Sequence, residues 1–263
     1  MNFLYETHLH TSPESACAVA HGPDYVQGYI DAGYTGIIVT NHFFRGNTGL
    51  DRSLPWAEWV KQFYRGYEDT YNEGLRRGLD VFFGWEETYD DSDDYLVYGL
   101  DKEWLLNHPE AKHWTRREQY EQVHLAGGCV VQAHPFRQVY YISEINLSPY
   151  LVDAVEVANG GNEQSFDALA FRYAQKNGLP MTAGSDIHST DQLQSSYLFG
   201  VYLPEKIQTI HDYVNAARKK TIVSVRTIPG RLDVHGDEII SLPVFIKNAE
   251  GNDINSTIEE FLA

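Results

Sequence analysis

The sequence predicts an α/β fold in which short buried strands alternate with helices and form a barrel. Short apolar runs without polar alternation recur along the chain, as in strands that a mostly parallel sheet buries on both faces. Longer segments with a helical spacing of apolar residues separate these runs. Hydrophobic residues make up 43% of the 263 positions, which is enough for a sizeable core. We expect one barrel domain over residues 1–225 and a small extension over residues 226–263 that packs on it.

The first predicted strand starts at Phe3 and ends in the stretch Glu6-Thr7-His8-Leu9-His10-Thr11. Side chains two residues apart in a strand point to the same face, so His8 and His10 should lie side by side, with Leu9 opposite. Two neighbouring imidazoles suit a borderline metal ion such as zinc, iron or manganese. Two histidines can also fall two apart on a half-exposed strand by chance.

The later elements follow in order from the same signals. Gly22-Pro23-Asp24 favours a helix start, because proline fits the first helical turn. Thr115 and Glu118 have the spacing of a capping box at the start of another helix. Strands are expected at residues 36–40, 81–85, 95–99, 129–133, 153–157, 180–184, 197–203 and 222–225. Helices are expected at residues 25–31, 55–77, 115–126, 165–176 and 204–219, with a short helix and a turn within 102–112.

The alternation of strands and helices stops after Arg226. Pro229-Gly230 and Gly236-Asp237 are turn signals. We therefore expect the extension to contain some β-structure and a terminal helix over residues 256–262.

Charge, cysteine content and hydropathy indicate which partners and which cellular compartment to expect. The formal net charge of −17 disfavours binding to a phosphate backbone, which depends on Lys and Arg, so a nucleic-acid partner is not expected. The two cysteines, Cys17 and Cys129, form no closely spaced pair. The N-terminus shows no signal-peptide pattern, and no apolar run approaches the roughly 20 residues that cross a bilayer. We expect a cytoplasmic protein without a membrane partner.

Metal-binding residue types recur at the ends of the predicted strands. The carboxyl ends of barrel strands converge on one site, so these side chains should meet there. Imidazoles and carboxylates are the ligands that borderline metals prefer, and the set is large enough for more than one ion. Its members are His8, His10, His42, Glu86, His134, Glu156, Asp186 and His188.

At these strand ends the chain resembles the PHP (polymerase and histidinol phosphatase) family. The resemblance spans about residues 1–225 and rests on an ordered set of motifs: His8-Leu9-His10, Thr40-Asn41-His42, Gly84-Trp85-Glu86, Ala133-His134-Pro135, Val155 to Asn159, and Gly184-Ser185-Asp186-Ile187-His188. The resemblance implies a distorted seven-stranded (β/α) barrel. It also implies a metal-dependent phosphoesterase with two or three divalent ions.

The resemblance assigns a role to each matching residue. His8 and His10 would hold one metal together with Asp186. Glu86 would bridge two metals, and His134 would bind the second. His42 and His188 would bind a third ion or complete the cluster.

The chain departs from the family pattern at three places. Asp94 stands where the family commonly has a histidine, and a carboxylate there would favour manganese or iron over zinc. Glu14 is the candidate for the acidic residue or histidine that often follows the first motif. Asn41 replaces an aspartate that could orient a ligand.

Other residues are candidates for binding the substrate. Arg137, three residues after His134, could hold a phosphate through its planar fork, or could form a surface ion pair. Arg45 is a second candidate, although an ordinary surface role is favoured for it. Asn159 could orient the substrate or Glu156, which could itself be a metal ligand or support one. Glu87 should face away from Glu86 and be structural.

Three functions remain open from the sequence. The first is a phosphatase or phosphodiesterase of the PHP type, acting on a small phosphorylated metabolite through a metal-activated hydroxide. The second is a di-metal hydrolase of a non-phosphate bond. The third is a non-catalytic metal-dependent binding or regulatory protein. Selectivity should lie in the loops over residues 43–54 and 140–150. The pair Tyr140-Tyr141 could stack on a sugar or a base but is expected to serve packing.

Overall fold

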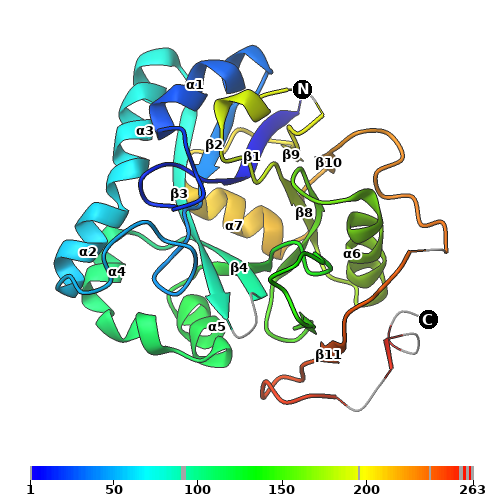
Figure 1. Cartoon of the computed structure of the whole chain (residues 1–263). Coiled ribbons are helices and arrows are strands. Elements are labelled where there is room, and N and C mark those ends of the chain that lie inside the picture. Colours follow the sequence, from blue (N-terminus) through cyan, green and yellow to red (C-terminus); the bar gives the residue numbers. More distant parts are fainter. Residues whose placement is uncertain are drawn as a thin grey trace.

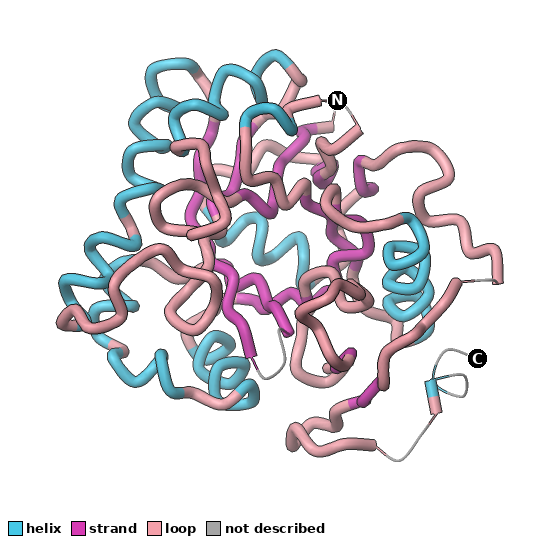
Figure 2. The backbone as a smooth tube through the Cα atoms, viewed as in Figure 1, coloured by secondary structure: helices cyan, strands magenta, loops and turns pink. Residues whose placement is uncertain are grey.

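The computed structural model describes residues 2–89, 93–194, 196–236, 238–254, 257, 258 and 261. Nine strands of the described chain form one sheet, in the order β10-β9-β1-β2-β3-β4-β5-β7-β8. Their bounds are β1 (Phe3–Leu9), β2 (Gly36–Val39), β3 (Asp80–Tyr89), β4 (Asp93–Tyr98), β5 (Cys129–Gln132), β7 (Ala154–Asn159), β8 (Met181–Gly184), β9 (Gly200–Leu203) and β10 (Ser224–Arg226). The strands form a ring with most helices outside it (Figures 1 and 2).

The ring closes where the chain after β8 returns to β1. Asp186 N donates to His8 O at 2.8 Å, and His10 N donates to Ile187 O at 3.3 Å. The predicted barrel of PHP type is therefore confirmed, although its sheet has more strands than the expected seven. Two strands run against their neighbours, because β4 is antiparallel to β3 and β5, and β9 is antiparallel to β1.

The helices largely follow the predicted pattern. Their bounds are α1 (Gly22–Asp31), α2 (Trp56–Phe63), α3 (Arg65–Arg77), α4 (Lys102–Asn107), α5 (Arg116–Leu125), α6 (Gln164–Lys176) and α7 (Ile210–Arg218), with short 3-10 helices at Pro109–His113 and Thr190–Gln192. Among the described residues, no helix is both long enough and apolar enough to span a membrane.

Two helix predictions need correction. The helix expected at 55–77 is divided at Tyr64 into α2 and α3. Just after the division, Gly66 lies so close to the loop before α1 that an added Cβ would be 2.4 Å from Glu14 Oε2. The helix expected from residue 204 begins only at Ile210, because Thr209 and Asp212 form a capping box there.

An apolar core fills the barrel on the side of the strand starts. Tyr5, Val201 and Leu203 contribute from β1 and β9, and Tyr213 and Val214 contribute from α7. In Figure 1, α7 is visible through the ring of strands, at its far end. This core closes one end of the barrel, so a cavity can open only at the other end.

The C-terminal extension runs along α6 in Figure 1. Its strand β11 (Val244–Ile246) pairs in parallel with β6 (Ile145–Leu147), and neither strand was predicted individually. Leu232, Ile240 and Leu242 pack against the α6 cluster. The expected terminal helix at 256–262 falls mostly outside the described residues, as does Asp237 of one predicted turn. The division at residue 225 remains a prediction.

Candidate metal centre

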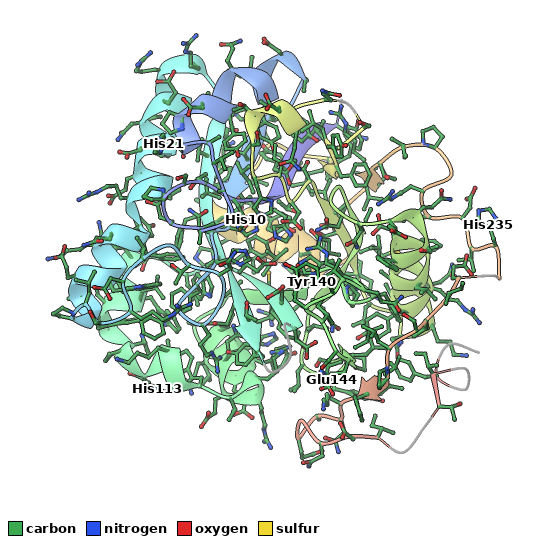
Figure 3. All side chains as sticks on the ribbon, viewed as in Figure 1. His10, His21, His113, Tyr140, Glu144 and His235 are labelled. Carbon is green, nitrogen blue, oxygen red and sulfur yellow. The ribbon has the colours of Figure 1, made fainter. Side chains whose placement is uncertain are left out.

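Histidines and carboxylates from six strands meet at the end of the barrel opposite α7. A cavity of about 600 Å³ is lined by Arg45, Arg137 and Tyr141 together with six members of this set, His42, Glu86, Asp94, His134, Asp186 and His188. His8 and His10 are fully buried beneath them. Asp94 reaches the same edge from the start of its strand, because β4 runs antiparallel to its neighbours. Figure 3 shows His10 and Tyr140 near the middle of the molecule, whereas His21, His113 and His235 lie at its periphery.

An irregularity in β1 turns both histidines of the first motif inward. The register of β1 against β2 shifts between Glu6 and Leu9. His8 and His10 consequently face Glu86 and Asp186. Glu6 instead lies against Tyr29, whose hydroxyl donates to it at 3.0 Å. Glu6 Oε1 also accepts the backbone N–H groups of His8 at 2.8 Å and Ser185 at 2.9 Å. The carboxylate of Glu6 thus fixes the backbone at both closing strands.

Glu86 occupies the centre of the cluster. Its carboxylate oxygens lie 3.2 Å from His8 Nε2, 3.3 Å from His10 Nε2 and 3.2 Å from His134 Nε2. His42 Nδ1 is 2.8 Å away. Four imidazoles from three segments therefore surround one buried carboxylate, which is the geometry expected of a bridging ligand.

Asp186 forms the second focus of the cluster. Its Oδ1 lies 3.5 Å from His8 Nε2 and 3.3 Å from His10 Nε2, and its Oδ2 accepts from Arg137 Nη2 at 2.6 Å. Asp186 and His134 both have left-handed backbones, with φ of 52° and 28°. Non-glycine residues rarely adopt this region, and the strain costs about 1–3 kcal/mol each. The surrounding structure thus holds two candidate ligands in costly conformations.

The donor atoms form four groups of three within the described chain, and the atoms of each group lie within 4.8 Å of one another. The groups are His8-His10-Glu86, His8-His134-Asp186, His10-His42-His188 and Glu86-Asp94-His134. His42 Nδ1 is buried and lies 2.8 Å from Glu86 Oε2, but the two atoms do not have the geometry of a hydrogen bond. A buried set of imidazoles and carboxylates fits borderline divalent metals.

The buried charges of the cluster shift one another's pKa values. Burial lowers the pKa of His8, but the carboxylates of Glu156, Asp186 and Glu86 outweigh burial and raise it well above its ordinary value. Burial likewise raises the pKa of Asp186, yet His8 and Arg137 hold it well below its usual range. Each group favours its charged form only because partners of the opposite charge are present.

Several side chains orient the candidate ligands. Glu156 Oε1 lies 3.0 Å from His8 Nδ1, and Ser15 Oγ lies 3.0 Å from His10 Nδ1. Asn41 Oδ1 accepts from Ser15 Oγ at 3.0 Å. Glu156 belongs to none of the four groups among the described residues, so the structure places it behind His8. Such contacts fix the tautomer and the direction of a ligating histidine.

Both predicted arginines lie at the cavity. Arg137 is ion-paired with Asp186 and also donates to Asn159 Oδ1 at 2.9 Å. Its side chain is 15% exposed, so it is not a surface residue. Arg45 lies 3.5 Å from Glu87 Oε1 and its guanidinium is 3.9 Å from the centre of the Tyr89 ring. Glu87 faces away from the cluster as predicted, and burial raises its pKa to about 7.

The structure bears on the alternatives left open for Asn159 and for the pair Tyr140-Tyr141. Asn159 is fully buried and donates to Glu156 Oε2 at 2.9 Å, so it orients Glu156 rather than a substrate. Tyr140 and Tyr141 were expected to pack, but they are 98% and 54% exposed. Both line the mouth of the cavity. The packing interpretation of this pair is wrong, because the loop that carries them projects over the open end of the barrel.

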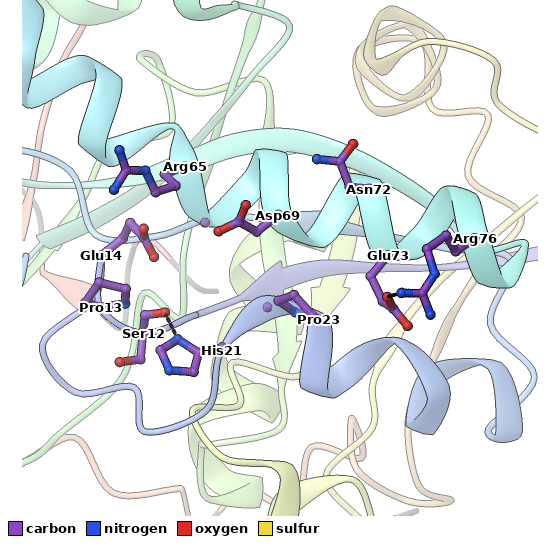
Figure 4. A pocket seen from close by; sticks show the side chains of 12 residues that line it. Ser12, Pro13, Glu14, His21, Pro23, Arg65, Asp69, Asn72, Glu73 and Arg76 are labelled. Atoms are coloured by element: carbon purple, nitrogen blue, oxygen red, sulfur yellow. Dashed lines mark hydrogen bonds and ion pairs between the residues drawn. The ribbon is translucent and has the colours of Figure 1, made fainter.

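Glu14 does not reach the cluster. It is buried in a second cavity of about 480 Å³, between the loop before α1 and one face of α3. Figure 4 shows it beside Arg65 and Asp69. Thr11 Oγ1 donates to Glu14 Oε2 at 3.4 Å. The expectation that Glu14 serves as a ligand is therefore not supported, since the loop after β1 turns its side chain outward.

Sequence reasoning missed some residues at the site. Ser15 was overlooked because a serine in a loop carries no distinctive signal. Cys17 lines the cavity beside His42, although the lack of a closely spaced partner cysteine indicated neither a disulfide nor a thiolate metal site. Glu6 stood within the first motif, where a buried carboxylate beside two histidines could have been suspected.

Comparisons with known proteins agree with this picture. A family model described as PHP-associated matches residues 166–221. No curated protein matches the chain.

Three solved structures resemble the fold. One is a two-domain protein from Bacteroides vulgatus containing a predicted PHP-like metal-dependent phosphoesterase, with 15% identity, a TM-score of 0.59, and coverage of 86% of this chain and 65% of that one. PsfC from Pseudomonas syringae has 15% identity, a TM-score of 0.54, and coverage of 88% and 93%. The lesion-specific endonuclease PfuEndoQ from Pyrococcus furiosus has 12% identity, a TM-score of 0.56, and coverage of 87% and 59%.

These matches confirm the predicted resemblance to the PHP family and its barrel. At such identities the solved structures show the fold alone. This chain spans 65% of the length of the Bacteroides protein. The expectation that nucleic acid is not a partner gains no support, because one similar structure is an endonuclease.

Proposed function

We propose that the chain is a metal-dependent phosphoesterase that hydrolyses a small phosphorylated molecule. The observation that carries this proposal is the position of Glu86, whose carboxylate lies within 3.3 Å of nitrogen atoms from four histidines. Buried carboxylates surrounded by imidazoles at the mouth of a barrel are expected to hold clustered divalent cations. The site lies at the only end of the barrel that the apolar core leaves open in the described chain.

Two or three manganese, iron or zinc ions would occupy the cluster. We assign Glu86 as the bridging ligand, because among the carboxylates of the four groups of donors it is the one that belongs to two, and its two oxygens can bind separate ions. Asp94 adds a carboxylate to the group with His134, which favours manganese or iron. His42 and His188 form a further group with His10, which supports a third ion. Bound divalent ions would lower the pKa of a coordinated water and so supply a hydroxide nucleophile at neutral pH.

The side chains around the cluster fit a phosphate ester. Arg137 is the cation nearest to Asp186, and its guanidinium can donate to the non-bridging oxygens of a phosphate. Arg45 lies in the wall of the same cavity, where it can meet a second negative group. The exposed rings of Tyr140 and Tyr141 at the mouth can contact the organic part of the substrate. The cavity of about 600 Å³ is in the range of small-molecule sites.

Elemental analysis of the purified chain tests the metal cluster first. We expect about two or three ions per chain, and at least one fewer in His134→Ala. His113→Ala is the matched control, since His113 is exposed and far from the cavity. Near-zero metal in the wild-type chain, even after incubation with manganese, iron or zinc, would contradict the proposal.

A substrate panel then tests the reaction. The metal-loaded chain should release phosphate from simple monoesters or cleave diesters, and Glu86→Gln should not. The panel includes a short oligonucleotide, because the similar endonuclease leaves nucleic acid open. It also includes amide and lactone substrates, because a di-metal hydrolase of another bond would bind metal without releasing phosphate. Metal binding without turnover of any class would favour a binding or regulatory role.

A further inference from the structure

The C-terminal extension places one buried arginine behind the metal cavity. Arg231 is 11% exposed, and its Nε donates to Asp167 Oδ2 at 2.7 Å. Its Nη2 also donates to the backbone oxygens of Asn159, at 3.2 Å, and Asn162. The guanidinium therefore links the first turn of α6, through Asp167, to the turn at the end of β7. A planar fork with several donors suits such a multiple contact, which a lysine cannot reproduce.

Asp167 continues the network toward the cavity. Its Oδ2 accepts from the backbone N–H of Asn159 at 3.1 Å. Its Oδ1 accepts from Asn162 Nδ2 at 2.9 Å. The turn over residues 159–162 is therefore bound by both the carboxylate of Asp167 and the guanidinium of Arg231, which are also ion-paired with each other.

The fixed turn holds Arg137. Asn162 Oδ1 accepts from Arg137 Nε at 2.8 Å, and Asn159 Oδ1 accepts from Arg137 Nη2 at 2.9 Å. The same Nη2 donates to Asp186 Oδ2 at 2.6 Å. A continuous set of hydrogen bonds thus leads from the extension, through two asparagines, to a candidate metal ligand.

We propose that Arg231 is a positioning residue for Arg137 and, through it, for Asp186. The proposal rests on the function assigned to the cavity, and it deepens that assignment by including the extension in the site. Arg231 lies outside the segment that matches the PHP-associated model and beyond the predicted barrel domain. Without the hydrogen bonds of Arg231, Asn159 and Asn162 would lose their fixed positions. Arg137 would then no longer hold Asp186 in one orientation.

Arg231→Lys is the principal variant, because it keeps the positive charge beside Asp167 but removes the fork. Arg218→Lys is its matched control. Arg218 also joins a carboxylate, Asp153, to a backbone oxygen, that of Gly128, but it does so at the opposite end of the barrel. Circular dichroism should show that both variants fold.

The Nε–H signal of Arg137 in a ¹H–¹⁵N spectrum gives a readout that needs neither metal nor turnover. The signal is assigned to Arg137 by its disappearance from the spectrum of Arg137→Lys. In the metal-free protein the signal should shift in Arg231→Lys and stay in place in Arg218→Lys. An unchanged signal in Arg231→Lys would overturn the proposal. A shifted signal in a chain that binds no metal would support the positioning role while the proposed function fails.

Calorimetric titration with manganese measures the consequence for the site. We expect Arg231→Lys to weaken manganese binding about tenfold, the lower end of the effect of residues that orient ligands. In an Arg137→Ala background the same change should have no further effect, because the network passes through Arg137. An equal loss in both backgrounds would show a general structural role and would refute the proposal.

Asn162→Ala keeps the test decisive if Arg231→Lys fails to fold. It removes one link between Asp167 and Arg137 without leaving a buried charge unpaired. We expect a shifted Arg137 signal and weaker manganese binding, with an unchanged melting temperature. Manganese affinity and an Arg137 signal both equal to those of the wild type would contradict the network.

Discussion

The two ends of the barrel are built from the same strands but on opposite principles. At the closed end, formed by the strand starts and α7, the interior is filled by apolar and aromatic side chains such as Tyr5, Leu203 and Tyr213. At the open end, formed by the strand ends, the buried side chains are histidines and carboxylates. Burial at the closed end is favourable by itself, at about 25 cal/mol per Å² of apolar surface.

Burial at the open end is unfavourable unless each charge is compensated. Taking a carboxylate out of water costs several kcal/mol, which only an opposite charge, hydrogen bonds or a bound cation can offset. Two residues there, His134 and Asp186, also have left-handed backbones. The apolar packing of the closed end therefore offsets the free-energy cost of the strained, charged open end.

Replacing the central carboxylate of the open end should have the largest effect. Glu86→Gln should lower the turnover of a phosphate ester by about 100- to 1,000-fold, as expected when an essential electrostatic group is removed. Elemental analysis should also show at least one fewer ion per chain. Glu87→Gln, the neighbouring carboxylate that faces away, should retain both properties within a few-fold. Equal losses in the two variants would show that the open end is not organised around Glu86.

A cavity at the closed end should cost stability without affecting metal binding. Leu203 is 1% exposed in the barrel core, and Leu203→Ala should lower the free energy of unfolding by about 2–5 kcal/mol. Urea denaturation monitored by fluorescence measures this change. Leu125→Ala removes the same atoms from a side chain that is 80% exposed, and its effect should stay within about 0.5 kcal/mol. A loss of metal in Leu203→Ala would contradict the division of labour between the ends.

Asp167, behind the open end, should make stability depend on pH. Burial raises the pKa of Asp167 to about 6, although Arg231 partly opposes the rise. Between about pH 4 and pH 6 the unfolded chain has lost this proton and the folded chain still holds it, so stability falls as the pH rises through that range. The free energy of unfolding should fall by on the order of 1–3 kcal/mol over that range in the wild type, and Asp167→Asn should remove this pH dependence. Urea denaturation of both metal-free proteins at pH 4.5 and 6.5 measures this difference in the free energy of unfolding. If that free energy changes with pH equally in the wild type and the variant, Asp167 is not the group responsible.

The second cavity should show the smallest effect. Glu14 is as buried as the carboxylates of the cluster, but it belongs to none of the donor groups found among the described residues. Glu14→Gln should leave metal content and turnover unchanged and should alter stability by less than about 1 kcal/mol, because a neutral amide can keep the contact with Thr11. Loss of an ion in this variant would restore Glu14 as a ligand.

Local sequence patterns predicted much of the fold. The strands β2, β5, β7 and β8 lie where continuous apolar runs predicted them, because a run of that kind has few other stable environments. The small strand β6 was not predicted, and β11 was expected only as β-structure somewhere in the extension, since each depends on pairing with a segment about 100 residues away. The division of the helix at Tyr64 was missed as well, because it accompanies the close approach of Gly66 to Glu14.

The same distinction applies to the site. Residue type and position at a strand end indicated His8, His10, His42, Glu86, His134, Asp186 and His188, and the family resemblance added Asp94; the structure brings these eight together. Glu156 was indicated by the same strand-end pattern but belongs to none of the donor groups among the described residues. The prediction failed for Glu14, whose direction is set by a loop rather than by a strand. Asn162, Asp167 and Arg231 were not foreseen, because hydrogen bonds between distant segments leave no periodic signal in the sequence.

The sequence by itself determined the alternation of strands and helices, the chemical types of the donors and their places along the strands. These follow from local rules, since the period of a strand and the chemistry of a side chain are properties of neighbouring residues. The closed barrel was needed to see which donor atoms lie within 4.8 Å of one another, which carboxylate lies at the centre, and that Arg231 of the extension contacts Asp167 behind the cavity. Those relations are distances between segments far apart in the chain, and they exist only once the barrel has closed.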